Sequence, residues 1–134
     1  MSLSSDREKE TLEKILLDYA ARIGCLAKVE NVPQSQLEQI IASLENSEDT
    51  RYALLICATF AKRQANRLGK GWNMASAIVE AMKTLYEKNA GKEEARKVLG
   101  LAKWVRESLE DIRVPQQGVK DYEEYLNYLI GSKR

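Results

Sequence analysis

The fold is decided by the run Tyr52-Ala-Leu-Leu-Ile-Cys-Ala-Thr-Phe-Ala61, in which no residue carries a charge. The chain continues without a helix breaker into Lys62-Arg-Gln-Ala-Asn-Arg-Leu-Gly69, where cations and amides replace the apolar side chains. Because glycine commonly ends a helix, we predict one helix that begins near Asn46 or Ser47 and ends at Gly69. Its first half is apolar on every side, so we expect it to be the central helix of the fold.

Amphipathic patterns on both sides of this run predict five further helices. Serine with glutamate three residues later predicts capping boxes at Ser5 and Ser35, and Asp121 with Glu124 predicts a third helix start. Gly91 and Pro115 are expected to stop two of the helices. The predicted helices are Asp6–Lys28, Gln36–Leu44, Asn73–Asn89, Lys92–Ile112, and a short one from Asp121 to Gly131. The predicted fold class is therefore all-α, a single-domain bundle of about six helices around a central apolar helix.

Length and composition agree with one folded domain over residues 1–134. The chain is 44% hydrophobic and 31% charged, as is usual for a globular domain. We expect residues 1–5 to be disordered or partly left over from expression cloning. No uncharged run is long enough to cross a membrane and no signal-peptide pattern is present, so we expect a cytoplasmic protein without a membrane partner. Cys25 and Cys57 stand in apolar helical surroundings, which suits buried free thiols.

The net charge of +1 conceals a segregation along the chain. Residues 1–56 contain 6 Lys/Arg and 10 Asp/Glu, a net −4, whereas residues 57–106 contain 11 and 4, a net +7. Residues 107–134 contain 4 and 6, a net −2. This asymmetry indicates an anionic partner for the middle segment, or pairing between segments.

The sequence offers little that catalysis needs. It has no histidine, which removes the commonest acid–base group and the commonest zinc ligand. Gly69-Lys70-Gly71 lacks the preceding strand and the spacing of a phosphate-binding loop. Neighbouring carboxylates such as Glu93 and Glu94 do not face each other on a helix. We therefore expect no enzymatic activity, no cofactor and no metal.

Arg63 and Arg67 fall on the same helical stripe as Tyr52, Ile56 and Phe60, so guanidinium groups occupy what we expect to be the core-facing side. Two interpretations remain open. A carboxylate of another helix could pair with the arginines, and the candidates are Glu107, Glu110 and Asp111. Alternatively, the planar guanidinium forks bind phosphate.

The other candidate nucleic-acid-binding residues surround this stripe or lie in the helix predicted at 92–112. Lys62 and Lys70 extend the basic tip, and Trp72 either stacks on a base or fixes its own helix to the core. In the later helix, we expect the basic stripe opposite the core to be either a binding surface or a solvated face of mixed charge. Its candidate residues are Arg96, Lys103 and Arg106.

The segments Phe60–Arg67 and Val98–Arg106, together with the length and the helical plan, resemble the small subunits of CRISPR RNA-guided effector complexes. The resemblance implies a non-catalytic subunit, active in antiviral defence, that lines a filament of several subunits and contacts the guide–target duplex or the target strand through basic patches. The acidic ends of this chain depart from a uniformly basic small subunit.

From these observations we expect a non-catalytic helical subunit of a larger complex that binds the backbone of RNA or single-stranded nucleic acid through the basic middle segment. Other protein subunits would be its further partners. The alternative is a protein–protein adaptor or self-associating bundle with no nucleic-acid role, in which acidic and basic segments complement each other between chains.

Overall fold

The computed structural model describes residues 3–131, apart from the side chains of residues 3–6 and 8. Helices joined by turns and loops make up this part of the chain, which contains no strand, so the predicted all-α bundle is confirmed. The elements are α1 (Leu3–Val29), α2 (Gln34–Ala42), the 3-10 helix η1 (Ser43–Asn46), α3 (Tyr52–Leu68), α4 (Trp72–Glu87), α5 (Lys92–Ser108) and α6 (Tyr122–Gly131).

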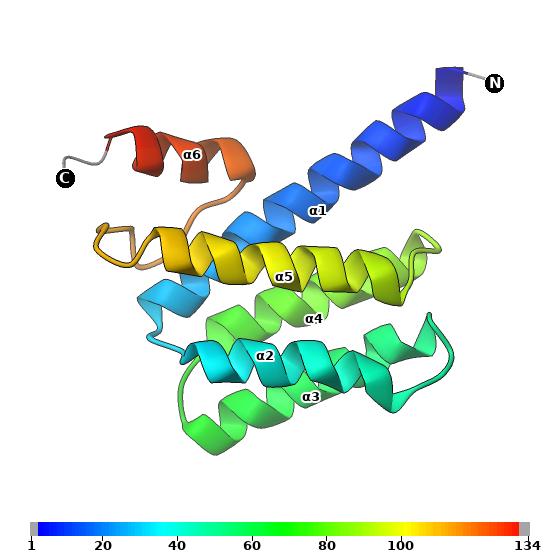
Figure 1. The fold of residues 1–134 in the computed structure, drawn as a ribbon, viewed down its shortest axis with the longest axis horizontal. Helices are drawn as coiled ribbons and strands as arrows, with labels where there is room; N and C mark the ends of the chain where they lie inside the picture. The colour runs from blue at the N-terminus through cyan, green and yellow to red at the C-terminus, as the bar shows by residue number, and fades with distance from the viewer. Residues whose placement is uncertain (1–2, 132–134) are drawn as a thin grey trace.

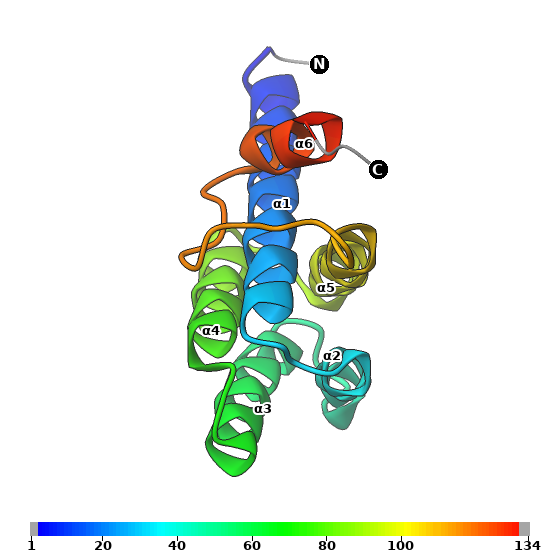
Figure 2. The same ribbon diagram turned by 90° about the vertical axis from the view of Figure 1, so that its left-hand side faces the viewer.

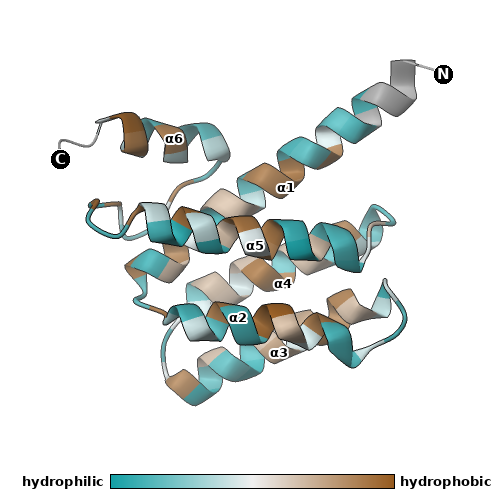
Figure 3. Ribbon diagram, in the orientation of Figure 1, coloured by the Kyte–Doolittle hydropathy of each residue, from teal (hydrophilic) through white to brown (hydrophobic). Residues whose placement is uncertain are grey.

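The helices form two layers with α1 running between them (Figure 1). Figure 2 shows α2 and α5 on one side of the molecule, α3 and α4 on the other, and α1 between α4 and α5. The short α6 packs on the second half of α1, where Tyr125 joins Ala21 and Cys25 in one apolar cluster. Figure 3 shows apolar and polar residues alternating along α2 and α5, as expected for helices that bury one side only.

The central apolar helix of the bundle is α1. Every residue from Ala20 to Ala27 is buried except Arg22, because α4, α5 and α6 cover different sides of this segment. Gly24 permits the closest approach: a Cβ atom there would stand 2.5 Å from the carbonyl oxygen of Ala102 in α5. The close packing of α1 on α5 therefore needs a residue without a side chain at this position.

In contrast, α3 lies at an edge of the molecule, where it packs on α4 and η1 (Figure 1). Its buried side is formed by Ala53, Leu54, Cys57, Ala61 and Ala65. The predicted core stripe is wrong. Tyr52 is 57% exposed, and Leu55 and Ile56 are exposed as well, because they lie on the side of α3 opposite the buried residues.

Two predicted helix starts are corrected. α2 begins at Gln34, with Pro33 as its N-cap and no side-chain cap, so the capping box at Ser35 does not form. α3 begins at Tyr52 rather than near Ser47, because the chain first completes η1 and a turn. The carboxylate of Asp49 accepts the backbone N–H groups of Arg51 (2.9 Å) and Tyr52 (2.8 Å), which caps the helix there.

At the N-terminus, α1 begins at Leu3, before the predicted Asp6, so residues 3–5 belong to the helix. Met1 and Ser2 lie outside the described residues, as do the side chains of the predicted Ser5–Glu8 capping box.

Other boundaries agree more closely with the sequence. Gly69 ends α3 in the left-handed conformation, at φ 71°. The carboxylate of Asp121 accepts the N–H of Glu124 at 2.9 Å, which confirms the predicted cap of α6. α5 ends at Ser108, before the predicted Ile112, because single turns replace the helix after Leu109.

Both cysteines are buried free thiols, as expected. Cys57 belongs to the main apolar cluster, and Cys25 to a smaller one formed with α6. Burial raises the pKa of Cys57 to about 11 and that of Cys25 to about 12. Neither thiol is therefore available as a thiolate near neutral pH.

Candidate nucleic-acid interface

The C-terminal half of α3 presents three cations to solvent. Lys62, Arg63 and Arg67 are all exposed and lie within one side of the helix, given 100° per residue. Among the side chains that the structure describes, no carboxylate lies within 4.0 Å of any of the three. Arg63 donates only to the side-chain oxygen of its neighbour Gln64, at 3.2 Å. The three charges are therefore uncompensated over the described part of the chain.

This placement excludes one of the two interpretations of the arginines, pairing with a carboxylate, for the described residues. The proposed carboxylate partners Glu107, Glu110 and Asp111 form no ion pair with Arg63 or Arg67. Tyr52 and Ile56 of the same stripe are exposed like the arginines, and only Phe60 between them is partly buried. The guanidinium groups therefore do not interrupt a core-facing side.

The side of α3 next to the cations is fixed by amide groups. The Nε2 atom of Gln64 donates to the Oε1 atoms of Gln36 and Gln39 in α2, both at 2.9 Å. Gln64 thus links α3 to α2. The helix that carries the exposed arginines is therefore held in place by α2 on the side next to them.

Trp72 lies beside the same helix end. Gly69 and Gly71 both adopt positive φ, 71° and 82°, which turns the chain sharply between α3 and α4. The indole Nε1 of Trp72 then donates to the Oδ1 of Asn66 at 3.3 Å, and the ring stays 47% exposed. Lys70, in the turn, is half-buried. Trp72 is therefore not buried in the core, and a hydrogen bond holds it against the end of α3.

The carboxylate of Glu30, the residue directly after α1, fixes the start of α4. Gly71, the N-cap residue, has no side chain to cap the helix. The two carboxylate oxygens of Glu30 instead accept the N–H of Asn73 at 3.1 Å and that of Met74 at 2.7 Å. A carboxylate at this position satisfies free backbone donors and favours the positive end of the helix dipole. Glu30 thereby holds the turn that carries Trp72.

The cations of α5 are placed differently. Arg96 forms an ion pair with Glu45 of η1, and the Nζ atom of Lys103 lies 3.9 Å from a carboxylate oxygen of Glu38 in α2. The Nε atom of Arg106 donates to the backbone oxygen of Val32 at 2.8 Å. The expected stripe opposite the core is therefore wrong: these side chains face α2 and η1, and pair within the molecule.

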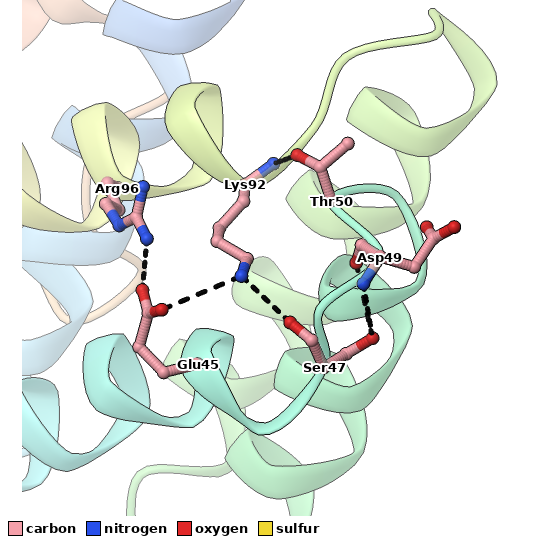
Figure 4. A network of polar contacts seen from close by, with 6 residues as sticks. All are labelled: Glu45, Ser47, Asp49, Thr50, Lys92 and Arg96. Atoms are coloured by element: carbon pink, nitrogen blue, oxygen red, sulfur yellow. Dashed lines mark hydrogen bonds and ion pairs between the residues drawn. The ribbon is translucent and has the colours of Figure 1, made fainter.

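Figure 4 shows how this pairing also holds the loop before α3. The Nζ atom of Lys92 donates to the backbone oxygen of Ser47 at 2.8 Å and lies 3.6 Å from Glu45. The Thr50 hydroxyl accepts the N–H of Lys92 at 2.8 Å. The hydrogen bond from Arg96 lowers the pKa of the Glu45 carboxyl group from its ordinary 4.5, and the charges of Arg96 and Lys92 add to the effect.

The structure thus separates the predicted site residues into two groups. Lys62, Arg63, Arg67, Lys70 and Trp72 gather at the end of α3, whereas Arg96, Lys103 and Arg106 lie on α5, in the other layer, against α2 and η1 (Figure 2).

Sequence reasoning missed the exposed residues Tyr52, Leu55 and Ile56. The helical periodicity of the sequence could have revealed the exposure of Tyr52 and Ile56. Because Arg63 and Arg67 share their stripe, exposure of the arginines requires exposure of Tyr52 and Ile56.

No helix within residues 3–131 is both long and apolar enough to cross a membrane. In the same residues, no three His, Cys, Asp or Glu side chains gather where they could hold a metal ion. Comparison of the chain with models of known protein families, with curated proteins and with solved structures finds no match.

Proposed function

We propose that this protein is a non-catalytic subunit that binds the backbone of RNA or single-stranded DNA through the C-terminal half of α3. The observation that carries the proposal is the exposure of Lys62, Arg63 and Arg67 on one side of a helix with no carboxylate near them in the described residues. The surface is thus narrower than the whole basic segment, since Arg96, Lys103 and Arg106 of α5 have partners within the molecule.

The mechanism is electrostatic. Arg63 and Arg67 are one helical turn apart, with Cβ atoms about 5–6 Å from each other, so both forks can contact one strand. Cations that neutralise phosphates release condensed counterions, which makes binding sensitive to salt and nearly independent of sequence. Trp72, half exposed beside them, offers a ring on which a base can stack. A small-subunit role in an RNA-guided complex is compatible with such a surface.

The test is fluorescence anisotropy with labelled single-stranded RNA and DNA between about 50 and about 200 mM salt. Each phosphate neutralised contributes about 0.7 to the slope of log affinity against log salt for a single strand. The double variant Arg63→Ala/Arg67→Ala should therefore bind more weakly and lower the slope by about 1.4.

The matched control is Lys83→Ala/Lys88→Ala, which removes two exposed cations from α4. It should leave both the affinity and the salt slope close to those of the unchanged protein. Equal effects of the two double variants would show that the protein responds to net charge alone, and would overturn a site on α3.

An adaptor function is the second candidate, and one observation favours it. Tyr52, Leu55 and Ile56 are exposed on the same side of α3 as the cations. An acidic amphipathic helix could lie along α3 with its apolar residues on this half and its carboxylates on the basic half. In that case Tyr52→Ala/Ile56→Ala would abolish capture of a protein partner, while nucleic-acid binding would be absent from the start.

A further inference from the structure

The glycine at position 100, in the middle of α5, has no role within the described molecule. A mid-helix glycine is less favourable than alanine, so a helix gains nothing by it unless something needs the space. At Gly24 and Gly91, a Cβ atom would stand 2.5 Å from a neighbouring atom. At Gly100, nothing lies within 4 Å of the position that a Cβ atom would take. Its φ is not positive either. The notch at Gly100 is open to the outside.

A large aromatic side chain stands next to this notch. Trp104 follows Gly100 by one helical turn, so the two residues lie on the same side of α5. Its side chain is 70% exposed, although tryptophan is highly buried on average. Since no atom of the indole lies within 4 Å of the Cβ position at Gly100, the ring does not fill the notch. This side of α5 therefore presents a protruding ring and an empty space, about 6 Å apart along the helix axis.

Opposite charges flank the ring and the notch at equal spacing. Lys97 precedes Gly100 by three residues, and Glu107 follows Trp104 by three residues. Both are exposed. Glu107 accepts one hydrogen bond, from the Nε2 atom of Gln34 at 2.8 Å, which leaves further lone pairs on its carboxylate. The pairs Gly100/Trp104 and Lys97/Glu107 share one midpoint along the helix, at the level of Ala102.

We propose that this side of α5 is the contact between two copies of the chain, packed antiparallel about a twofold axis at the level of Ala102. In such a contact, the patch on one copy meets the same patch on the other, so each residue type must find its complement on the same surface. Trp104 of each copy then enters the notch at Gly100 of the other. Lys97 of each copy lies level with Glu107 of the other, within reach of its long side chain.

The chemistry of the surface favours a second copy over other occupants. The exposed charged residues on this side of α5 are Glu93, Lys97 and Glu107, so the side has no excess of positive charge for nucleic acid, unlike the basic end of α3. Exposed tryptophan is enriched at protein interfaces and often dominates their affinity. α5 and α3 lie in different layers (Figure 2), so the contact leaves the end of α3 accessible. The proposal does not depend on the nucleic-acid function.

The test is sedimentation equilibrium of the purified chain over a wide concentration range, with the variants Trp104→Ala and Gly100→Gln. We expect a monomer–dimer equilibrium that each variant weakens at least about tenfold, as truncation of a central interface tryptophan does. Both positions are solvent-facing, so both variants should fold, which circular dichroism checks.

Two further measurements are specific to this geometry. Lys97→Glu should weaken the dimer, and adding Glu107→Lys to it should restore association, whereas the matched reversal Lys83→Glu on α4 should have no effect. In a Trp72→Phe background, the emission of Trp104 should shift to shorter wavelength as concentration rises, because the ring leaves water.

The proposal is overturned by a monomer at every concentration, by a dimer that Gly100→Gln and Trp104→Ala leave intact, or by open-ended assembly instead of a closed dimer.

Discussion

Gly24 of α1 lies directly against Ala102 of α5, so that a Cβ atom on the glycine would stand 2.5 Å from the alanine's carbonyl oxygen and 2.6 Å from Val105 Cβ. We predict that Gly24→Ala lowers the free energy of unfolding by about 1–3 kcal/mol, the usual cost of overpacking. The clash is with backbone, which cannot rotate away, and so it outweighs the gain in helix propensity of about 1 kcal/mol.

Urea denaturation of dilute protein measures the change, and Gly100→Ala on the facing helix is its control. There the Cβ atom meets open space, so the same substitution should stabilise the monomer by about 0.5–1 kcal/mol. Equal stabilisation by both substitutions would contradict the close helix contact.

The cap that Glu30 provides to α4 gives a second prediction. Glu30→Ala leaves the N–H groups of Asn73 and Met74 without their carboxylate, and should cost about 1 kcal/mol of folding stability. Glu30→Gln, which keeps an acceptor and loses the charge, should cost less. Glu48→Ala, at an exposed carboxylate, is the control for thermal denaturation and should change little. A loss no larger than that of Glu48→Ala would argue against the cap.

Acid should weaken the contact between η1 and α5. The pKa of Glu45 is lower in the folded than in the unfolded chain, so the pairing with Arg96 is fully present above pH 4.5 and is lost as the pH falls through the lowered value. We predict that Glu45→Gln is less stable than the unchanged protein at neutral pH, and that the difference shrinks below pH 4.5. Urea titrations at a series of pH values measure it, with Glu48→Gln as the control. A difference that does not vary with pH would exclude the ion pair as its source.

The two thiols should be unreactive in the folded protein. Burial raises the pKa of Cys25 to about 12 and that of Cys57 to about 11, and it also blocks access. We predict that a disulfide reagent such as DTNB at pH 8 modifies neither thiol in native buffer and modifies both in denaturant. Rapid modification of either cysteine in native buffer would show that its part of the core opens readily.

The sequence predicted the helices more accurately than their packing. Helical periodicity and glycine signals located six helices, and Gly69 and Asp121 marked ends that the structure confirms. The start of α3 was misplaced because Ser47 and Asp49 both suit an N-cap, and only the folding of η1 against α5 selects Asp49.

The side of α3 that faces inward could not be read from hydrophobicity alone. Ala53, Ala61 and Ala65 are buried while Tyr52 and Ile56 are exposed, because a close approach to α4 requires small side chains rather than the most apolar ones. For the site, the sequence located the basic end of α3. It could not distinguish those cations from Arg96 and Lys103, since their partners Glu45 and Glu38 lie more than fifty residues away.

The position of α1 between the two layers has a consequence for how the chain is made. Ala20–Ala27 is synthesised before α4, α5 and α6, and the surfaces of these three helices cover it. A nascent chain that has not yet reached α5 cannot bury this segment, so the segment stays exposed until α5 and α6 have emerged. The bundle therefore closes late, and until then the nascent chain presents an apolar helix to chaperones.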